Sequence, residues 1–313
     1  MDQQRAEIRD FLASRRAKIT PAQAGLPTSA RRRVPGLRRE EVAVLAGVST
    51  EWYTRLEKGH IGGVSDDVLD AVARALQLDD DERTHLFDLA RSSRPEGRAP
   101  SRRRDAELPP QVQWLLDAMT MSSAFVRNGR TDVLAGNALA RALHAPMFGS
   151  ATIDQRGRPN IARYIFLDPG AQDFFADWDA AASATAALLR AEAGREPRDR
   201  ALRDLVGELS TLSPEFRGRW AAHDVLIRHD GVKRLRHPDV GHLELTFQSL
   251  DLPLPGRAVH NLITYTAEPG SASEERLKVL ASWAAPSASV RTAPVTRDHR
   301  TAGLPGARPP EPA

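Results

Sequence analysis

Side chains of the types that can bond to the edges of DNA bases recur at helical spacing just after residue 49. A helix through this segment would carry four of them on one face: Thr50, Glu51, Thr54 and Arg55. Arginine bonds guanine bidentately, a carboxylate accepts from cytosine, and threonine contacts the thymine methyl group; each good contact discriminates by about 1–3 kcal/mol. We therefore expect this face to contact bases, and for Glu51 the alternative is a salt bridge to Arg55.

Two short helices that meet at a glycine would position that face. Residues 38–46 and 49–58 carry helical patterns, and Gly47 lies between them, where a turn needs a residue that tolerates positive φ. Ala43 supplies the small contact of a tight crossing. Ser49 fits the N-cap of the second helix and is also a candidate DNA contact. The apolar positions are filled by Val42, Ala46, Val48, Tyr53 and Leu56. This pattern predicts a helix-turn-helix; the alternative is a plain structural hairpin.

Positive charge gathers around the same segment. Residues 1–60 hold ten Arg and two Lys against seven acidic residues, a net charge of +5, so the other residues of this +3 chain sum to −2. Such a footprint is typical of a module that binds the phosphate backbone of double-stranded DNA, although uneven arginine usage on a solvated surface is the alternative. Helix-end cations are expected to approach phosphates, and a basic loop to add backbone or minor-groove contacts. These residues are Arg38, Arg39 and Lys58, with Arg31, Arg32 and Arg33 in the loop.

Other chemistry finds little support in the sequence. There is no cysteine, so disulfides, thiol catalysis and cysteine-ligated zinc are excluded. Four histidines gather in the sequence at spacings that fit no common metal site: His223, His229, His237 and His242. No phosphate-binding glycine loop, nucleophile elbow or zinc-protease motif occurs. We therefore predict no enzyme, no metal and no cofactor.

The chain divides into two folded segments. Helical patterns at 5–19, 38–46, 49–58, 66–76 and 79–91 predict an all-α DNA-binding domain over residues 1–92. A linker rich in proline and arginine is expected over 93–108, a second domain over 109–284 and a disordered tail over 285–313. The sequence shows no apolar run long enough for a membrane span and no signal-like start, so we expect a cytoplasmic, nucleoid-associated protein without membrane contact.

The second domain alternates strand and helix signals, which predicts an α+β domain with an antiparallel sheet. Strands are expected in pairs, turned at Asn128-Gly129 and at Asp230-Gly231, with further strand signals late in the domain. The predicted strands are 124–127, 131–135, 225–228, 232–237, 243–247 and 259–266. The predicted helices are 110–121, one starting at Asn137, 168–178, 179–193, 198–209, 213–222 and 273–283.

Several separated motifs resemble one known family. Residues 1–90 resemble the lambda-repressor-like (XRE-type) helix-turn-helix domain, and RVPGLRREEVA at 33–43 with WYTRLEKG at 52–59 is similar to the MmyB-like regulators. Motifs of the second domain follow in the order of that family: DVLAGNA at 132–138, FLDP at 166–169, GELS at 207–210, SPEF at 213–216, KRLRHP at 233–238 and YTAEPG at 265–270. The resemblance implies a PAS-like second domain with an apolar pocket for a fatty-acid-like molecule.

A ligand of that kind would need one cation or amide for its head group. Arg163 is the first candidate, because a guanidinium engages a carboxylate bidentately; the alternative is a structural salt bridge. Asn137 is the second, and its alternative is a helix cap. Four aromatic residues are candidates for the pocket lining and otherwise ordinary core: Phe166, Trp178, Trp220 and Tyr265.

Three functional hypotheses follow. The first is a ligand-responsive transcriptional regulator that binds an inverted repeat as a homodimer, because one helix buries too little surface for high specificity. The second keeps the DNA-binding domain but makes the second domain a dimerisation or protein-docking module without a small molecule. The third, an enzyme fused to a DNA-binding domain, needs convergent titratable groups that the sequence does not show.

Overall fold

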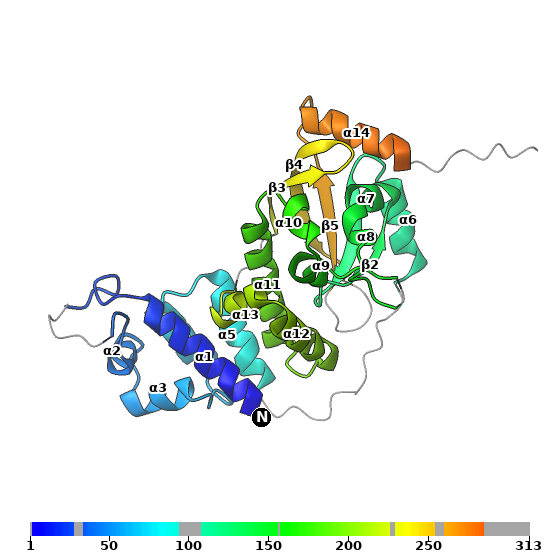
Figure 1. Ribbon diagram of the computed structural model, residues 1–313. Helices are drawn as coiled ribbons and strands as arrows, with labels where there is room; N and C mark the ends of the chain where they lie inside the picture. The colour runs from blue at the N-terminus through cyan, green and yellow to red at the C-terminus, as the bar shows by residue number, and fades with distance from the viewer. Residues whose placement is uncertain are drawn as a thin grey trace, which may run out of the picture.

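The computed structural model describes residues 2–27, 34–93, 108–155, 157–225, 229–253 and 260–284. Within them the chain forms an amino-terminal helical domain and a second domain of helices around a sheet (Figure 1). The predicted fold class, an all-α helix-turn-helix domain followed by an α+β, PAS-like domain with an antiparallel sheet, is confirmed. Most of the expected linker, the expected tail and the basic loop of Arg31, Arg32 and Arg33 lie outside the described residues.

The described part of the first domain consists of helices around one apolar core. They are α1 (Asp2–Lys18), α2 (Arg39–Leu45), α3 (Thr50–Glu57), α4 (Asp66–Ala75) and α5 (Asp80–Ser92). The predicted apolar positions Val42, Tyr53 and Leu56 are fully buried, together with Phe11 and Leu12 of α1. Because α2 and α3 contribute to the same core, their relative orientation is fixed by packing rather than by the turn alone.

The junction of α2 and α3 has the predicted chemistry. Gly47 has a φ of +67°, a backbone conformation that favours glycine. Ser49 is the N-cap of α3, and its hydroxyl accepts a hydrogen bond of 3.1 Å from the backbone N–H of Trp52. The turn and the cap therefore end one helix and start the next within four residues, which makes the crossing tight.

The second domain is built on an antiparallel sheet. Its strands are β1 (Ser123–Asn128), β2 (Val133–Gly136), β3 (Asp230–His237), β4 (Gly241–Asp251) and β5 (His260–Thr266), and their spatial order is β2-β1-β5-β4-β3. Each described pairing is antiparallel. The central strand β5 therefore joins the amino-terminal hairpin of the domain to its carboxyl-terminal hairpin.

Helices cover both faces of this sheet. On one face, Phe125, Leu245 and Ile263 form a core with α7 (Ala138–Leu143), α8 (Ala145–Phe148), α9 (Ile161–Leu167), α10 (Gly170–Phe174) and α14 (Ala272–Ala284). On the other face, Val126 and Leu262 pack against α6 (Pro110–Ala118). This arrangement accounts for β1, whose residues are buried on both sides.

Three further helices form a layer between the sheet and the first domain. They are α11 (Trp178–Arg195), α12 (Arg200–Leu212) and α13 (Pro214–Ala221), and they enclose a core of their own with α9 (Figure 1). The predicted N-cap Ser213 is confirmed, since its hydroxyl accepts from the N–H of Phe216. None of the described helices is long and apolar enough to cross a membrane.

Two predicted turns of the sheet were wrong in detail. Asn128-Gly129 does not close a two-residue hairpin, because Thr131 takes a positive φ of 66° and the N–H of Asn128 pairs with the carbonyl of Asp132, which lengthens the loop. Asp230-Gly231 lies inside β3, and the turn follows His237 instead. Of the strand predicted at 225–228, only Val225 is described, and it is not in a strand.

Candidate functional site

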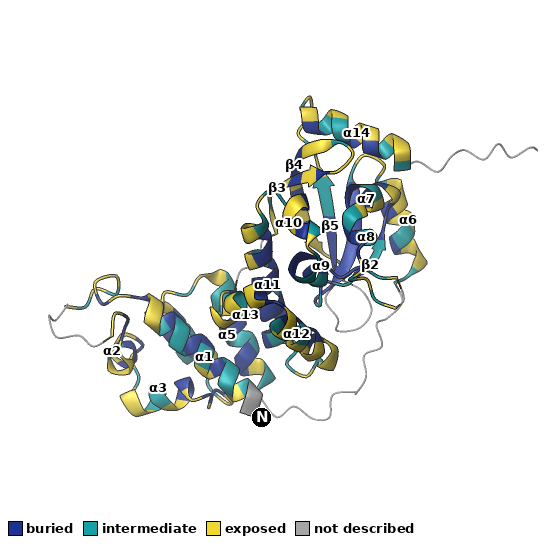
Figure 2. Cartoon of the chain, viewed as in Figure 1, coloured by how far each residue is buried: buried dark blue, intermediate teal, exposed yellow. Residues whose placement is uncertain are grey.

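The outer face of α3 carries the predicted base-contacting side chains. Thr50, Glu51 and Arg55 are exposed and Thr54 is half-buried. Figure 2 shows exposed residues along α3. Within the described residues, the side chains of Glu51 and Arg55 form no hydrogen bond and no ion pair. The alternative pairing of Glu51 with Arg55 is therefore absent from this structure, and both charged groups remain available to a ligand.

The inner end of α3 is fixed by a buried carboxylate. Glu57 is fully buried and pairs with Arg16 of α1 and with Arg39 at the start of α2, both at 2.9 Å. Burial by itself would raise the pKa of Glu57, but the hydrogen bonds and charges of Arg16 and Arg39 outweigh it and lower that pKa. The two ion pairs tie α3 to both neighbouring helices, so the exposed face keeps a defined direction.

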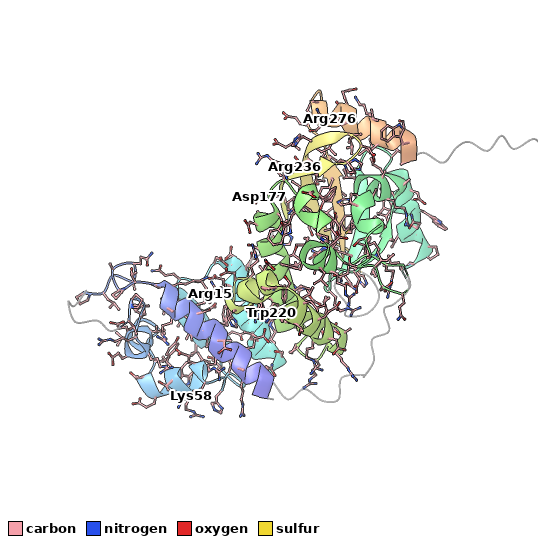
Figure 3. All side chains as sticks on the ribbon, in the orientation of Figure 1. Arg15, Lys58, Asp177, Trp220, Arg236 and Arg276 are labelled. Carbon is pink, nitrogen blue, oxygen red and sulfur yellow. The ribbon has the colours of Figure 1, made fainter. Side chains whose placement is uncertain are left out.

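The cations predicted to contact phosphate differ in whether they have an ion-pair partner within the protein. Arg38 is exposed and lies 3.4 Å from Glu40, while Arg39 is half-exposed and bound to Glu57. Lys58 is exposed directly after α3, and among the described residues it has no ion-pair partner (Figure 3). Lys58 and Arg38 therefore fit a contact with phosphate, whereas Arg39 has a structural partner that the sequence did not indicate.

A hollow of about 340 Å³ adjoins this face between α3 and α4. Arg55 and His60 line it together with the glycines of the following loop, and its other lining residues are Trp52, Val64, Ser65 and Val68. The main chain of this loop is accessible because Gly62 and Gly63 carry no side chain. The hollow extends the polar surface of α3 toward α4.

The two predicted head-group residues of the second domain are engaged within the protein. Arg163 forms a bidentate ion pair with Glu208 of α12, at 2.8 Å for the shortest contact. Asn137 caps α7, accepts from the N–H groups of Ala124 and Ala140, and donates to two main-chain carbonyls. A ligand at either residue would have to displace these bonds.

The four predicted aromatic residues are distributed over two cores, and Trp178 packs against both of them. Phe166, Trp178 and Trp220 belong to the helical core of α9, α11 and α13, where Trp220 stacks on Phe216. Tyr265 lies on the sheet beside Phe125 and His144. The structure therefore does not bring all four around one cavity.

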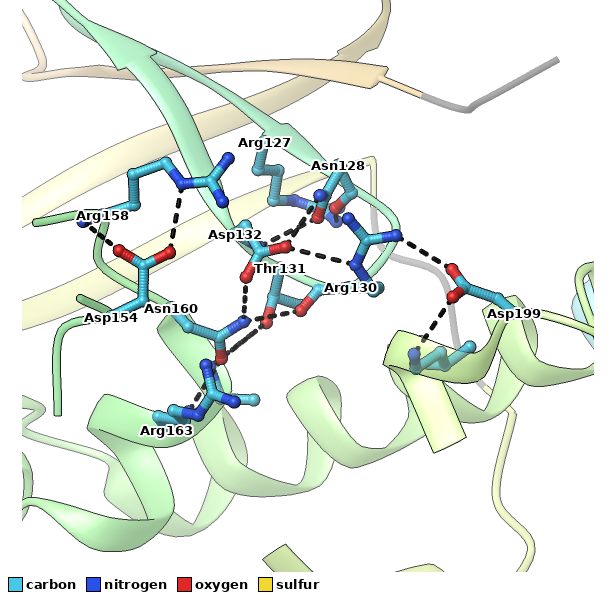
Figure 4. A network of polar contacts seen from close by, with 12 residues as sticks. Arg127, Asn128, Arg130, Thr131, Asp132, Asp154, Arg158, Asn160, Arg163 and Asp199 are labelled. Carbon is cyan, nitrogen blue, oxygen red and sulfur yellow. Dashed lines mark hydrogen bonds and ion pairs between the residues drawn. The ribbon is translucent and has the colours of Figure 1, made fainter. Parts of the chain in front are cut away.

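The loop after β1 is held by a polar network that surrounds Asn160 (Figure 4). Asn160 donates to Asp132 at 2.8 Å and caps α9 by accepting from the N–H of Arg163. Arg130 bridges Asp132 and Asp199, which is the N-cap of α12. The hairpin is thereby fastened to both α9 and α12.

A cavity of about 300 Å³ lies beside this hairpin, between the sheet, α11 and α5. Polar residues of the sheet line it, including Arg127, Ser249, Asp251 and Asn261, and α5 contributes Asp81 and Thr84. Sequence reasoning missed this cavity because its walls come from both domains. The one signal available was a lone arginine in an otherwise apolar strand, Arg127 of β1.

The two domains also meet in an extensive contact, here called the domain seam, where α1 and α5 face α11 and α13. Arg15 is buried and pairs with Glu82 at 2.7 Å, and it donates to the carbonyl of His223. Arg190 is buried, lies 3.7 Å above the ring of Trp220, and pairs with Glu7 at 3.5 Å. Ala191 and Val225 join the apolar core of the first domain.

Comparison with known protein families agrees with both halves of this arrangement. A helix-turn-helix domain matches residues 9–86, and the MmyB-like transcription regulator ligand binding domain matches residues 108–280. Comparison with curated proteins gives no match. The description of the second match names a transcription regulator. The second match covers more than half of the chain, and the chain therefore belongs to the MmyB-like transcription regulators, with a DNA-binding helix-turn-helix domain and a ligand-binding domain.

Proposed function

We propose that this protein is a sequence-specific DNA-binding regulator that places α3 in the major groove. The observation that carries the proposal is the outer face of α3, where Glu51 and Arg55 are exposed and unpaired among the described residues while Glu57 fixes the inner end of the helix. A helix held rigidly with free polar groups outward is suited to reading base edges. Arg38 and Lys58 would then contact phosphates on either side.

The protein would act as a homodimer on an inverted repeat. One recognition helix contacts few base pairs, and two half-sites about 34 Å apart let a symmetric pair of XRE-type domains double the contacts. Selection from a random duplex library tests this: we expect one enriched motif with two inverted half-sites. A library that stays random after selection would refute sequence-specific binding, and a single half-site would refute the dimer alone.

The second domain would sense a small apolar or fatty-acid-like molecule. The support is the aromatic core between the sheet and α7 to α10, where Phe125, His144, Phe174 and Tyr265 surround one another. The hydroxyl of Tyr164, which packs beside Phe174, is buried there without a hydrogen-bond partner. Such a core is a suitable environment for an alkyl chain.

Native mass spectrometry of the purified protein tests the sensor. We expect a mass above that of the chain which disappears under denaturing conditions and resolves as a small molecule. A bare mass in the native spectrum, unchanged after incubation with fatty acids, would contradict an apolar ligand and favour a dimerisation or docking role for this domain.

A further inference from the structure

The most unusual side chain of the second domain is Arg127. It is 7% exposed, and the one hydrogen bond of its guanidinium, to the carbonyl of Asn128, is long at 3.4 Å. No carboxylate of the described residues lies within ion-pair distance of it. A guanidinium has five N–H donors, and no nitrogen of Arg127 is both fully enclosed and without a partner, so its unpaired donors face accessible space. Most of the hydrogen-bonding capacity of Arg127 is thus unused inside the protein.

Arg127 lines the cavity of about 300 Å³ between the sheet, α11 and α5, and the cavity gives those donors a direction. Ser249 and Asn261 of the neighbouring strands lie around the same space, and Asn261 is held by a hydrogen bond of 2.9 Å to Asp251. This volume is at the lower end of the range for sites that hold small molecules. Burial lowers the pKa of Arg127 to about 10, so the group remains charged at neutral pH.

We propose that this cavity binds a small molecule through a carboxylate group held by Arg127. A carboxylate presents two oxygens that match the fork of a guanidinium, and the amide of Asn261 and the hydroxyl of Ser249 lie around the same space. The carboxylates of Asp81, Glu192 and Asp251 also line the cavity. Glu192 is paired with Arg195 at 3.2 Å and Asp251 accepts from Asn261, whereas the guanidinium of Arg127 has no carboxylate partner among the described residues. The inference deepens the proposed sensor function and rests on it. It assigns the head-group role to Arg127 rather than to Arg163, whose guanidinium is already bound by Glu208.

The cavity is lined by residues of both domains, so a bound ligand would contact both. Asp81 and Thr84 of α5 belong to the DNA-binding domain, while Ala191 and Glu192 of α11 belong to the other, and all four line the cavity. A bound molecule therefore touches both sides of the domain seam. Binding energy that depends on both sides favours the arrangement in which they are packed, which is the requirement for coupling a ligand to DNA affinity.

The test is calorimetric titration of the full chain with two series of carboxylates. Straight-chain fatty acids from acetate to tetradecanoate form one series, and short polar acids such as glutamate and glutarate form the other. We expect a member of one series to bind, and Arg127→Gln to weaken it by roughly tenfold to a hundredfold. The better series identifies the source of the carboxylate.

Three variants make the result specific. Arg127→Lys keeps the charge but loses the fork, so it should bind more weakly than the wild type. Thr84→Trp, placed on the other domain, should block the same ligand by filling the cavity. Arg203→Gln removes an exposed charge on α12 and should bind as the wild type does. Thermal melts confirm that each variant is folded.

Two outcomes would overturn the inference. If no carboxylate of either series binds the wild type, Arg127 does not form a carboxylate site. If Arg127→Gln and Thr84→Trp both bind the ligand as tightly as the wild type does, the ligand lies elsewhere. Native mass spectrometry separates this failure from failure of the sensor, because a bound small molecule that Arg127→Gln retains would leave the proposed sensor function standing when this site fails.

Discussion

Two exposed arginines of the DNA-binding domain, Arg39 and Arg55, differ in their ion-pair partners. Arg55 has no partner among the described residues, whereas Arg39 holds the buried Glu57. Sequence position alone predicted both as DNA contacts, because a pattern of cations does not show which ones the fold uses. Arg39→Ala should therefore lower the thermal stability of the protein as well as its DNA affinity, while a variant of Arg55 should leave the melting temperature unchanged.

The ion pairs of Glu57 allow a matched test of stability at the residue scale. Glu57→Gln removes the charge that Arg16 and Arg39 share, and breaking a buried pair from one side costs on the order of 3 kcal/mol. Glu51→Gln, an exposed site on the same helix, should change the free energy of unfolding by no more than about 0.5 kcal/mol. Urea denaturation of the two variants measures the contrast, and equal losses would show that Glu57 does not fix α3.

At the scale of elements, local chemistry was predictable and long-range pairing was not. Caps such as Ser49 and Ser213 follow from residue type, and the structure has both. The turn after β1 was misjudged because Thr131, a residue that seldom takes positive φ, does so where Asn160 holds it. The short helices α8 and α9 have too few turns to give a periodic signal in the sequence. The helix that carries Arg163, α9, was therefore not predicted.

The packing of α5 on α11 is tested by one methyl group. A Cβ added at Gly194 of α11 would lie 2.3 Å from the ring of His85, and that ring is buried against Phe11. Gly194→Ala should therefore open the domain seam and make α5 and α11 more susceptible to limited proteolysis.

Gly207→Ala of α12 is the matched control, because nothing lies within 4 Å of its added Cβ. It should leave the seam closed and stabilise the helix by about 0.5–1 kcal/mol. Proteolysis that proceeds equally in both alanine variants would show that the contact at His85 is unimportant.

For the whole molecule, the domain seam predicts a dependence of stability on pH. Burial lowers the pKa of His85 from 6.5 to about 3, and the charges of Arg190, Arg15 and His223 act in the same direction. The folded protein thus keeps His85 neutral, while the unfolded chain takes up a proton below pH 6.5. The contribution of the neutral His85 to the free energy of unfolding is constant above pH 6.5 and is lost as the pH falls from 6.5 toward 3.

Urea denaturation at pH 7.5 and pH 5 measures this effect. The free energy of unfolding should be lower at pH 5 than at pH 7.5, and His85 should account for about 2 kcal/mol of this difference. His85→Met, which keeps an adaptable apolar side chain at the site, should show a correspondingly smaller decrease. An identical pH dependence in the two proteins would place the titrating group elsewhere, for example at the buried His144 or at His223, whose pKa values burial also lowers to about 4.

The two-domain organisation itself could be predicted from composition and motifs, but the seam could not. Arg190 and Glu7 are 183 positions apart, and each reads in the sequence as an ordinary surface charge. Their burial follows from the packing of α11 against α1 and α5. The cavity of Arg127 escaped prediction for the same reason, since its walls join only when the domains do.

The central claim is that α3 contacts bases and that Arg55 reads one of them. The most direct test is the affinity of wild type and Arg55→Ala for the selected operator and for every single-base variant of it, measured by fluorescence anisotropy at one salt concentration. We expect Arg55→Ala to lose about 1–3 kcal/mol of discrimination at one guanine in each half-site and to keep it at the other positions. A uniform loss across all positions, or no loss, would contradict the placement of α3 in the major groove.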